Sequence, residues 1–193
     1  MGSGFTLVSG GGSPVTLDEF KEFATITHDE DDRSIENILL PAASEHLERL
    51  TGRALLTQVV DAYQDTLSRK IVLPRSRASS ITYIKYHDEN NVLTEIDPAN
   101  YTHSYGREPS IVQFDEDFTL PVIRKRADCV NIRYEAGRPL AEVGSNLKLG
   151  VMLLATHAYE HKGLVTYGAS IAEIPRTLEL FIETLRIRSL GRI

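Results

Sequence analysis

The spacing of apolar residues changes twice along this chain, and that change constrains the fold more than any single motif. Residues 15–53 and 145–189 carry apolar side chains at helical spacing, whereas residues 54–144 contain short alternating segments typical of strands. Strands gathered in one block between helical segments are typical of α+β proteins rather than alternating α/β proteins. The sequence therefore predicts an α+β fold: a helical domain of two N-terminal and two C-terminal helices, with an antiparallel β region inserted at 54–144.

Capping and breaking residues locate the ends of the predicted helices. Thr16 and Glu19 form the pattern T-x-x-E, a capping box that begins a helix. A second helix is expected to end before Gly52, and Pro41 should kink it or split off its first turn. Pro175 fits the first position of the final helix.

The first fourteen residues differ in composition from the rest of the chain. Residues 1–14 contain five glycines and three serines, so ordering them costs more entropy than their few apolar side chains offset. We expect a flexible arm in the free subunit. Phe5, Leu7 and Val8 give it a small apolar hook that could order against a neighbour in an assembly.

Acidic residues are concentrated near the N-terminus. The formal net charge of the chain is −6, so the chain as a whole does not look like a nucleic-acid binder. Residues 18–36 hold eight acids against two basic residues. A solvated loop with helix N-termini explains such a run, and an acidic surface facing a channel or an interface is the alternative. The residues at the centre of that candidate surface are Asp29, Glu30, Asp31 and Asp32.

Cysteine and hydropathy patterns limit the class of protein further. Cys129 is the single cysteine, so an intrachain disulfide and a multi-cysteine metal cluster are excluded. No basic segment precedes an apolar segment at the N-terminus, and the longest apolar run is too short to span a bilayer. We expect a soluble protein made in a reducing cytoplasm, without a membrane partner.

One segment has the pattern of a metal site. His157, Glu160 and His161 match H-x-x-E-H, in which two histidines on a helix bind zinc and the glutamate acts as general base. A zinc-dependent hydrolase is therefore the alternative function. The pattern fixes only three positions, and ordinary packing of His157 with exposed Glu160 and His161 also explains it. The sequence has no nucleophile elbow or phosphate loop, so we predict no catalytic residue, no metal site and no cofactor.

The strongest basic run is Arg124-Lys125-Arg126. A patch that touches DNA in a nucleic-acid accessory factor is one interpretation of this run. A solvated hairpin turn is the other, and the absence of interleaved aromatic residues favours it.

Several segments, in a fixed order, resemble tailed-phage head–tail connector (adaptor) proteins. None is specific alone, and it is their order that carries the resemblance. They are residues 15–20 (VTLDEF) with 50–58 (LTGRALLTQ), 73–74 (LP) with 79–84 (SSITYI), 97–101 (DPANY), 130–137 (VNIRYEAG) and the helical segment 147–160 that ends in HAYE.

The resemblance implies a structural protein rather than an enzyme. Such a protein would form a homo-oligomeric ring of roughly twelve copies below the portal protein. The ring would extend the DNA channel, let DNA pass without specific binding, and join the head to the next neck protein (a stopper) or to a tail terminator. The protein would be made in the host cytoplasm and would reside in the virion neck.

The same resemblance implies that the C-terminal segment docks on the portal. The final helix carries an apolar stripe, and residues 190–193 form a basic, apolar tail beyond the helical domain. Self-packing or fraying of this segment is the alternative. The candidate portal-binding residues are Phe181, Leu185, Arg186, Arg188, Leu190 and Arg192.

Overall fold

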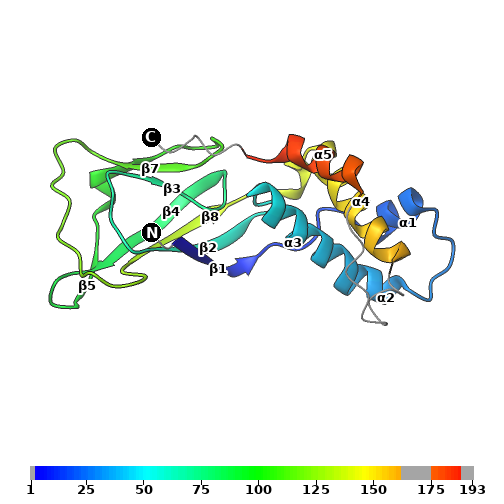
Figure 1. Ribbon diagram of the computed structural model, residues 1–193, viewed down its shortest axis with the longest axis horizontal. Helices are drawn as coiled ribbons and strands as arrows, with labels where there is room; N and C mark the ends of the chain where they lie inside the picture. The colour runs from blue at the N-terminus through cyan, green and yellow to red at the C-terminus, as the bar shows by residue number, and fades with distance from the viewer. Residues whose placement is uncertain (1–2, 162–174, 188–193) are drawn as a thin grey trace. The chain divides into compact units, whose positions relative to one another are not determined.

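A computed structural model describes residues 3–161 and 175–187, and in it helices and strands occupy separate parts of the sequence (Figure 1). The chain divides into a β unit, residues 3–10 and 57–138, and a helical unit, residues 11–56 and the described residues of 139–187. Apart from a strand at residues 3–10, the antiparallel strands form one block between two helical segments, and the predicted α+β class is confirmed. The described chain passes between the units at 10/11, 56/57 and 138/139. The last two positions correspond to the predicted boundaries at 53/54 and 144/145.

The first helix, α1 (Leu17–Ala24), begins at the predicted capping box. The Thr16 hydroxyl accepts a hydrogen bond from the Glu19 N–H at 3.2 Å, and the Thr16 N–H donates to Glu19 Oε2 at 3.0 Å. Thr25 ends the helix in the left-handed region, with φ of 56°. Phe20 is fully buried, so this short helix is held mainly by one aromatic anchor in the core of the helical unit.

Pro41 changes the type of the second helix without breaking it. The helical run consists of α2 (Asp32–Ser34), a π-helical turn η1 (Ile35–Leu39) and α3 (Leu40–Thr51), with Pro41 in the first turn of α3. Proline has no N–H, and its ring crowds the carbonyl four residues back in an α-helix. The wider turn before it, in which the Leu40 N–H donates to the Ile35 oxygen, relieves that crowding.

Helices α3, α4 (Ser145–Glu160) and α5 (Arg176–Leu185) pack together in the core of the helical unit. After a 3₁₀ turn, η3 (Leu140–Glu142), α4 packs against α3 and α5. Gly150 of α4 lies where these helices meet. A Cβ atom there would come within 3.0 Å of Leu47 Cδ2 and 3.3 Å of Leu185 Cδ1, so glycine permits the close approach. None of the helices formed by the described residues is long and apolar enough to cross a membrane.

The β unit contains two antiparallel sheets. The larger sheet has the order β1-β2-β8-β4-β5 and the smaller has the order β3-β7-β6. Their strands are β1 (Ser3–Gly10), β2 (Gln58–Gln64), β3 (Lys70–Val72), β4 (Ala78–His87), β5 (Leu93–Glu95), β6 (Tyr101–His103), β7 (Ile111–Phe114) and β8 (Val130–Ala136), with a 3₁₀ turn η2 (Pro98–Asn100) before β6.

Residues 3–10 form a strand, so the prediction of a flexible arm is wrong for this part of residues 1–14. β1 runs antiparallel to β2 from the pair Ser3 and Gln64 to the pair Gly10 and Gln58, with a bulge between Leu7 and Ser9. The backbone hydrogen bonds of this ladder cannot be inferred from amino-acid composition. They offset the entropy lost when the glycines and serines become ordered. The strand still buries little, because residues 4–10 are all exposed.

Candidate partner-binding surfaces

The predicted portal-binding segment contains both buried and exposed side chains. Leu185 is buried in the core of the helical unit, and Phe181 packs half-buried against the same core. Arg186 is exposed. The remaining three candidates lie outside the described residues: Arg188, Leu190 and Arg192.

Two hydrogen bonds attach the backbone after α5 to the C-terminal end of α3. Arg53 Nε donates to the Leu185 oxygen at 2.7 Å, and the Ile187 N–H donates to the Thr51 oxygen at 3.0 Å. The second bond satisfies a carbonyl in the last turn of α3, which has no partner within its own helix. A load applied beyond residue 187 would therefore reach α3 as well as α5.

Leu180 is an exposed apolar residue on α5 that the sequence analysis did not single out. It is 54% exposed, whereas Leu178 and Ile182 are buried. A leucine outside the apolar stripe of a helix is the sequence signal that could have identified it. Leu180 is therefore an exposed apolar side chain in this segment, in addition to the exposed basic side chain of Arg186.

The acidic residues between α1 and α2 belong to a local network. Lys21 Nζ lies 2.6 Å from Asp29 Oδ1 and 2.7 Å from Asp32 Oδ1, so one ammonium group joins the loop to α1. The Tyr159 hydroxyl donates to Asp31 Oδ2 at 2.7 Å. His28 Nδ1 lies 2.9 Å from Glu30 Oε2. All four candidate acids thus have partners within the helical unit.

These contacts leave two of the four carboxylates facing solvent. The side chains of Asp29 and Glu30 are 88% and 82% exposed, whereas that of Asp32 is 31% exposed. The hydrogen bond from Lys21 is the main reason that the pKa of Asp29 is lowered, and the Lys21 pKa is raised by Asp29 and then Asp32. The loop therefore presents the Asp29 and Glu30 carboxylates to solvent, while Lys21 links Asp29 and Asp32 to α1.

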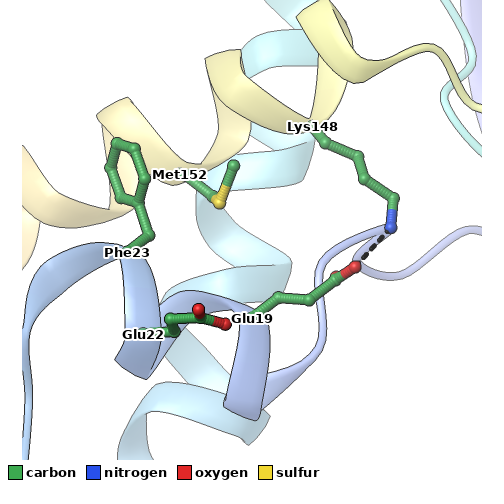
Figure 2. Close-up of a pocket in the computed structure, with 5 residues that line it drawn as sticks. All are labelled: Glu19, Glu22, Phe23, Lys148 and Met152. Atoms are coloured by element: carbon green, nitrogen blue, oxygen red, sulfur yellow. Dashed lines mark hydrogen bonds and ion pairs between the residues drawn. The ribbon is translucent and has the colours of Figure 1, made fainter.

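A shallow pocket of about 370 Å³ lies between α1 and α4. Figure 2 shows its lining: Phe23 and Met152 provide apolar walls, Glu22 lies near the base of the Glu19 side chain, and the Glu19 carboxylate pairs with Lys148. Phe23 is 40% exposed. Phe23 and Met152 could contact an apolar side chain of a partner in this pocket. Glu22 also lines the pocket, so it could pair with a neighbouring basic side chain of that partner.

Glu19 serves both the helix cap and the pocket. Lys148 Nζ lies 2.7 Å from Glu19 Oε1, while Glu19 Oε2 accepts the Thr16 N–H. The hydrogen bond from Lys148, followed by that from Thr16, lowers the pKa of the Glu19 carboxyl. The ion pair thereby joins α1 to α4 at one side of the pocket.

The H-x-x-E-H segment occupies the C-terminal end of α4. The His157 and His161 rings lie 4.4 Å apart between centroids, and His161 Nδ1 is 2.8 Å from the backbone oxygen of His157. Across residues 3–161 and 175–187, no three His, Cys, Asp or Glu side chains are grouped so that they could hold a metal ion. The third ligand that a zinc hydrolase requires is therefore not supplied by this part of the chain.

The basic run occupies an exposed loop of the β unit. Arg124, Lys125 and Arg126 are all exposed, and Arg126 Nη1 donates to Asn91 Oδ1 at 3.2 Å. The Arg124 N–H donates to the His87 oxygen, which attaches the loop to the end of β4. No aromatic ring is interleaved in this run, so the loop lacks the stacking platform of single-strand binders.

Solved structures of similar fold come from gene transfer agent (GTA) particles. The chain aligns with a chain in "Neck of empty GTA particle computed with C6 symmetry" with a TM-score of 0.75 at 18% identity, covering 98% of both chains. For "Neck of native GTA particle computed with C12 symmetry" the TM-score is 0.71 at 19% identity, again covering 98% of both. For "Virion of native gene transfer agent (GTA) particle" it is 0.72 at 20% identity, covering 97% of this chain and 98% of that chain. No curated protein matches the chain.

A family comparison extends this likeness from fold to sequence. The sequence pattern of the head completion protein family matches residues 15–177, which include the predicted connector motifs and most of the described chain. The predicted resemblance to phage head–tail connector proteins is confirmed by this match. The chain belongs to the head completion protein family.

Proposed function

We propose that this protein is a structural adaptor in the neck of a tailed phage or a related gene-transfer particle. Copies of the chain form a ring below the portal protein, extend the DNA channel, and join the head to a stopper or a tail terminator. The family match over residues 15–177 carries this proposal. The likeness to chains of GTA necks, which extends over 98% of both chains, supports it.

The electrostatics of the chain suit a channel through which DNA slides. Basic walls would hold phosphates through the release of counterions, and a chain of net charge −6 avoids this. The exposed carboxylates of Asp29 and Glu30 are the acids that would face the channel or a basic surface of a partner protein. The ion pairs from Lys21 to Asp29 and Asp32 link this loop to α1, which favours the same placement of its negative surface in every subunit.

Attachment to the portal is assigned to the C-terminal end of the chain. Arg186 is exposed there, and residues 188–193 add Arg188, Leu190 and Arg192. The bonds from Arg53 and Ile187 attach this end to α3 and α5, so a portal bound to the tail is connected to the core of the helical unit. Leu185 and Phe181 would act from within that core by fixing the direction in which the tail leaves it.

The proposal is tested by mixing the native chain, and a chain that lacks residues 188–193, with the portal protein encoded beside it. Negative-stain imaging and mass photometry should show that native protein adds a collar to the portal. The shortened chain should melt at the native temperature, since it keeps the Ile187 bond, yet should not join the portal. A native chain that ignores the portal would refute the adaptor role. A shortened chain that binds normally would refute only the assignment of the tail.

A further inference from the structure

Among the residues that the structure describes, no strand pairs with the outer edge of β1, and that edge lacks the usual protection. β1 is the terminal strand of the five-stranded sheet and pairs on one side only, with β2. Its sequence, SGFTLVSG, contains no charged residue and no proline. Soluble proteins commonly protect exposed strand edges with charges, prolines or very short strands. β5, at the opposite edge, is only three residues long and includes Glu95.

The exposed side chains of β1 are also apolar. Phe5, Leu7 and Val8 are 43%, 53% and 46% exposed, and they occupy one short strand. An apolar group of this kind next to unpaired backbone donors and acceptors favours addition of another strand or an apolar surface. A partner that covers β1 would bury these side chains and satisfy the open ladder edge together.

β1 is held in place before any partner arrives. Gly10 has φ of +86° and fits so closely against the chain that a Cβ atom would come within 2.5 Å of the Thr57 oxygen. The Arg75 guanidinium lies 4.9 Å from the centre of the Phe5 ring. A strand fixed in this way loses less conformational freedom on binding than a free arm would.

The strand belongs to the structure shared with the GTA neck chains but not to the family's sequence pattern. The pattern begins at residue 15, whereas the structural alignment covers 98% of this chain. The uncovered 2% amounts to about four residues of 193, fewer than the eight of β1. At least part of the strand is therefore common to those neck chains, although its sequence is outside the family pattern.

Charge indicates which partner fits. Every copy of the chain carries a net charge of −6, so a contact between two copies costs least where uncharged surface makes it. β1 offers an uncharged apolar edge, whereas the loop with Asp29 and Glu30 would oppose the approach of a second copy. We propose that the open edge of β1, with Phe5, Leu7 and Val8, is a contact surface for the neighbouring copy in the assembled ring. This inference rests on the proposed ring.

Rotational symmetry adds a geometric condition. In a closed ring, neighbouring subunits meet through two different surfaces, so β1 of one copy contacts a different region of the next copy rather than its β1. The contact therefore needs no two-fold pairing of identical strands. Removal of β1 contacts should leave folded monomers, since residues 4–10 bury little in their own chain.

Lysine substitutions with a matched control test the surface. Leu7→Lys and Val8→Lys put a charge into the proposed contact, and Val72→Lys is the control, because Val72 is 49% exposed in β3 at the edge of the smaller sheet. At equal subunit concentration, mass photometry with the portal should show about ten-fold fewer rings for both β1 variants, since a buried ammonium group is costly. Val72→Lys should form rings as the native chain does, and all variants should melt near the native temperature.

Photo-cross-linking identifies the occupant directly. A photoreactive phenylalanine derivative at position 5 should yield covalent dimers of this chain in the assembled ring. Adducts only with the portal or another neck protein would overturn the inference, as would the absence of adducts between chains. If the β1 variants form rings as well as the native chain does, the inference about β1 is overturned, while the adaptor role stays intact. If the native chain forms no ring on the portal, the proposed function fails and the inference fails with it.

Discussion

Tyr134 illustrates how one residue stabilises the β unit. Its side chain is fully buried, its hydroxyl accepts the Arg75 N–H at 3.0 Å, and it donates to the Arg75 oxygen at 3.3 Å. Burial raises the pKa of this phenol, so it stays a neutral donor and acceptor. Tyr134→Phe leaves two buried backbone groups without these bonds, and we expect the free energy of unfolding to fall by about 1–2 kcal/mol. Urea denaturation measures this.

Tyr63→Phe provides the matched control for that measurement. Tyr63 lies on β2 and is only half-buried, so loss of its hydroxyl should change the free energy of unfolding by no more than about 0.5 kcal/mol. Equal losses in the two variants would show that the bonds to Arg75 contribute nothing in particular.

Glu19 gives the helical unit a pH-dependent contribution. Lys148, and then Thr16, lower its pKa below the ordinary 4.5, so the folded state favours the ionised carboxylate. A lowered pKa stabilises the fold above the ordinary value, and this stabilisation is lost as pH falls from that value through the lowered one. Glu19→Gln should therefore reduce stability at pH 7 by about 0.5 kcal/mol, a value limited by solvent exposure, and flatten the decline between neutral and acid pH.

Thermal unfolding across this pH range checks the prediction for Glu19. Glu22→Gln is the control, because it makes the same change one turn along the same face of α1 while retaining the bonds from Lys148 and Thr16. A Glu19→Gln profile that parallels the native profile would contradict the assignment.

At the scale of elements, the attachment of β1 depends on Gly10. Gly10 and Gly12 both have positive φ, +86° and +106°, but only Gly10 lies against other atoms. Gly10→Ala forces a Cβ atom toward the Thr57 oxygen in addition to straining φ, whereas Gly12→Ala strains φ in open space. Amide hydrogen exchange should show β1 losing protection in Gly10→Ala and largely keeping it in Gly12→Ala. Equal protection in both variants would contradict this account.

The elements that local sequence determines were the ones that could be predicted. The capping box at Thr16 and the apolar stripe of α5 use residues within a few positions of one another, and both appear as expected. β1 could not be predicted, because its stability comes from a ladder with residues 48 to 61 positions away. Pro41 was identified as a perturbation, but a π turn rather than a break accommodates it.

The candidate surfaces show the same division. The acidic run was evident from sequence, but the role of Lys21 was not, because its partners Asp29 and Asp32 lie eight and eleven positions away across a loop. The burial of Leu185 and the exposure of Leu180 depend on how α5 packs on α3 and α4. Spacing predicted the stripe, but which apolar residues remained for a partner required the tertiary structure.

At the scale of the whole molecule, charge separates an adaptor from a DNA-binding factor. The chain has net charge −6, and its exposed basic loop at Arg124 to Arg126 is its strongest local exception. Nonspecific DNA binding comes mostly from phosphate neutralisation, so three adjacent cations on an acidic chain should not hold DNA at physiological salt. We expect no mobility shift of a short duplex at about 150 mM salt.

Repeating the mobility-shift measurement at lower salt distinguishes weak nonspecific retention from a DNA-binding site. An adaptor should show at most weak retention, which disappears as salt rises, and replacement of all three basic loop residues by glutamine should change little. Salt-sensitive binding that persists near physiological ionic strength, and that is lost in the glutamine variant, would contradict the prediction. That result would show that the loop contacts DNA, because its local positive charge would outweigh the repulsion between the acidic chain and the DNA phosphates. A channel subunit with such a site would hold DNA during passage, which is the reverse of what the proposed neck ring requires.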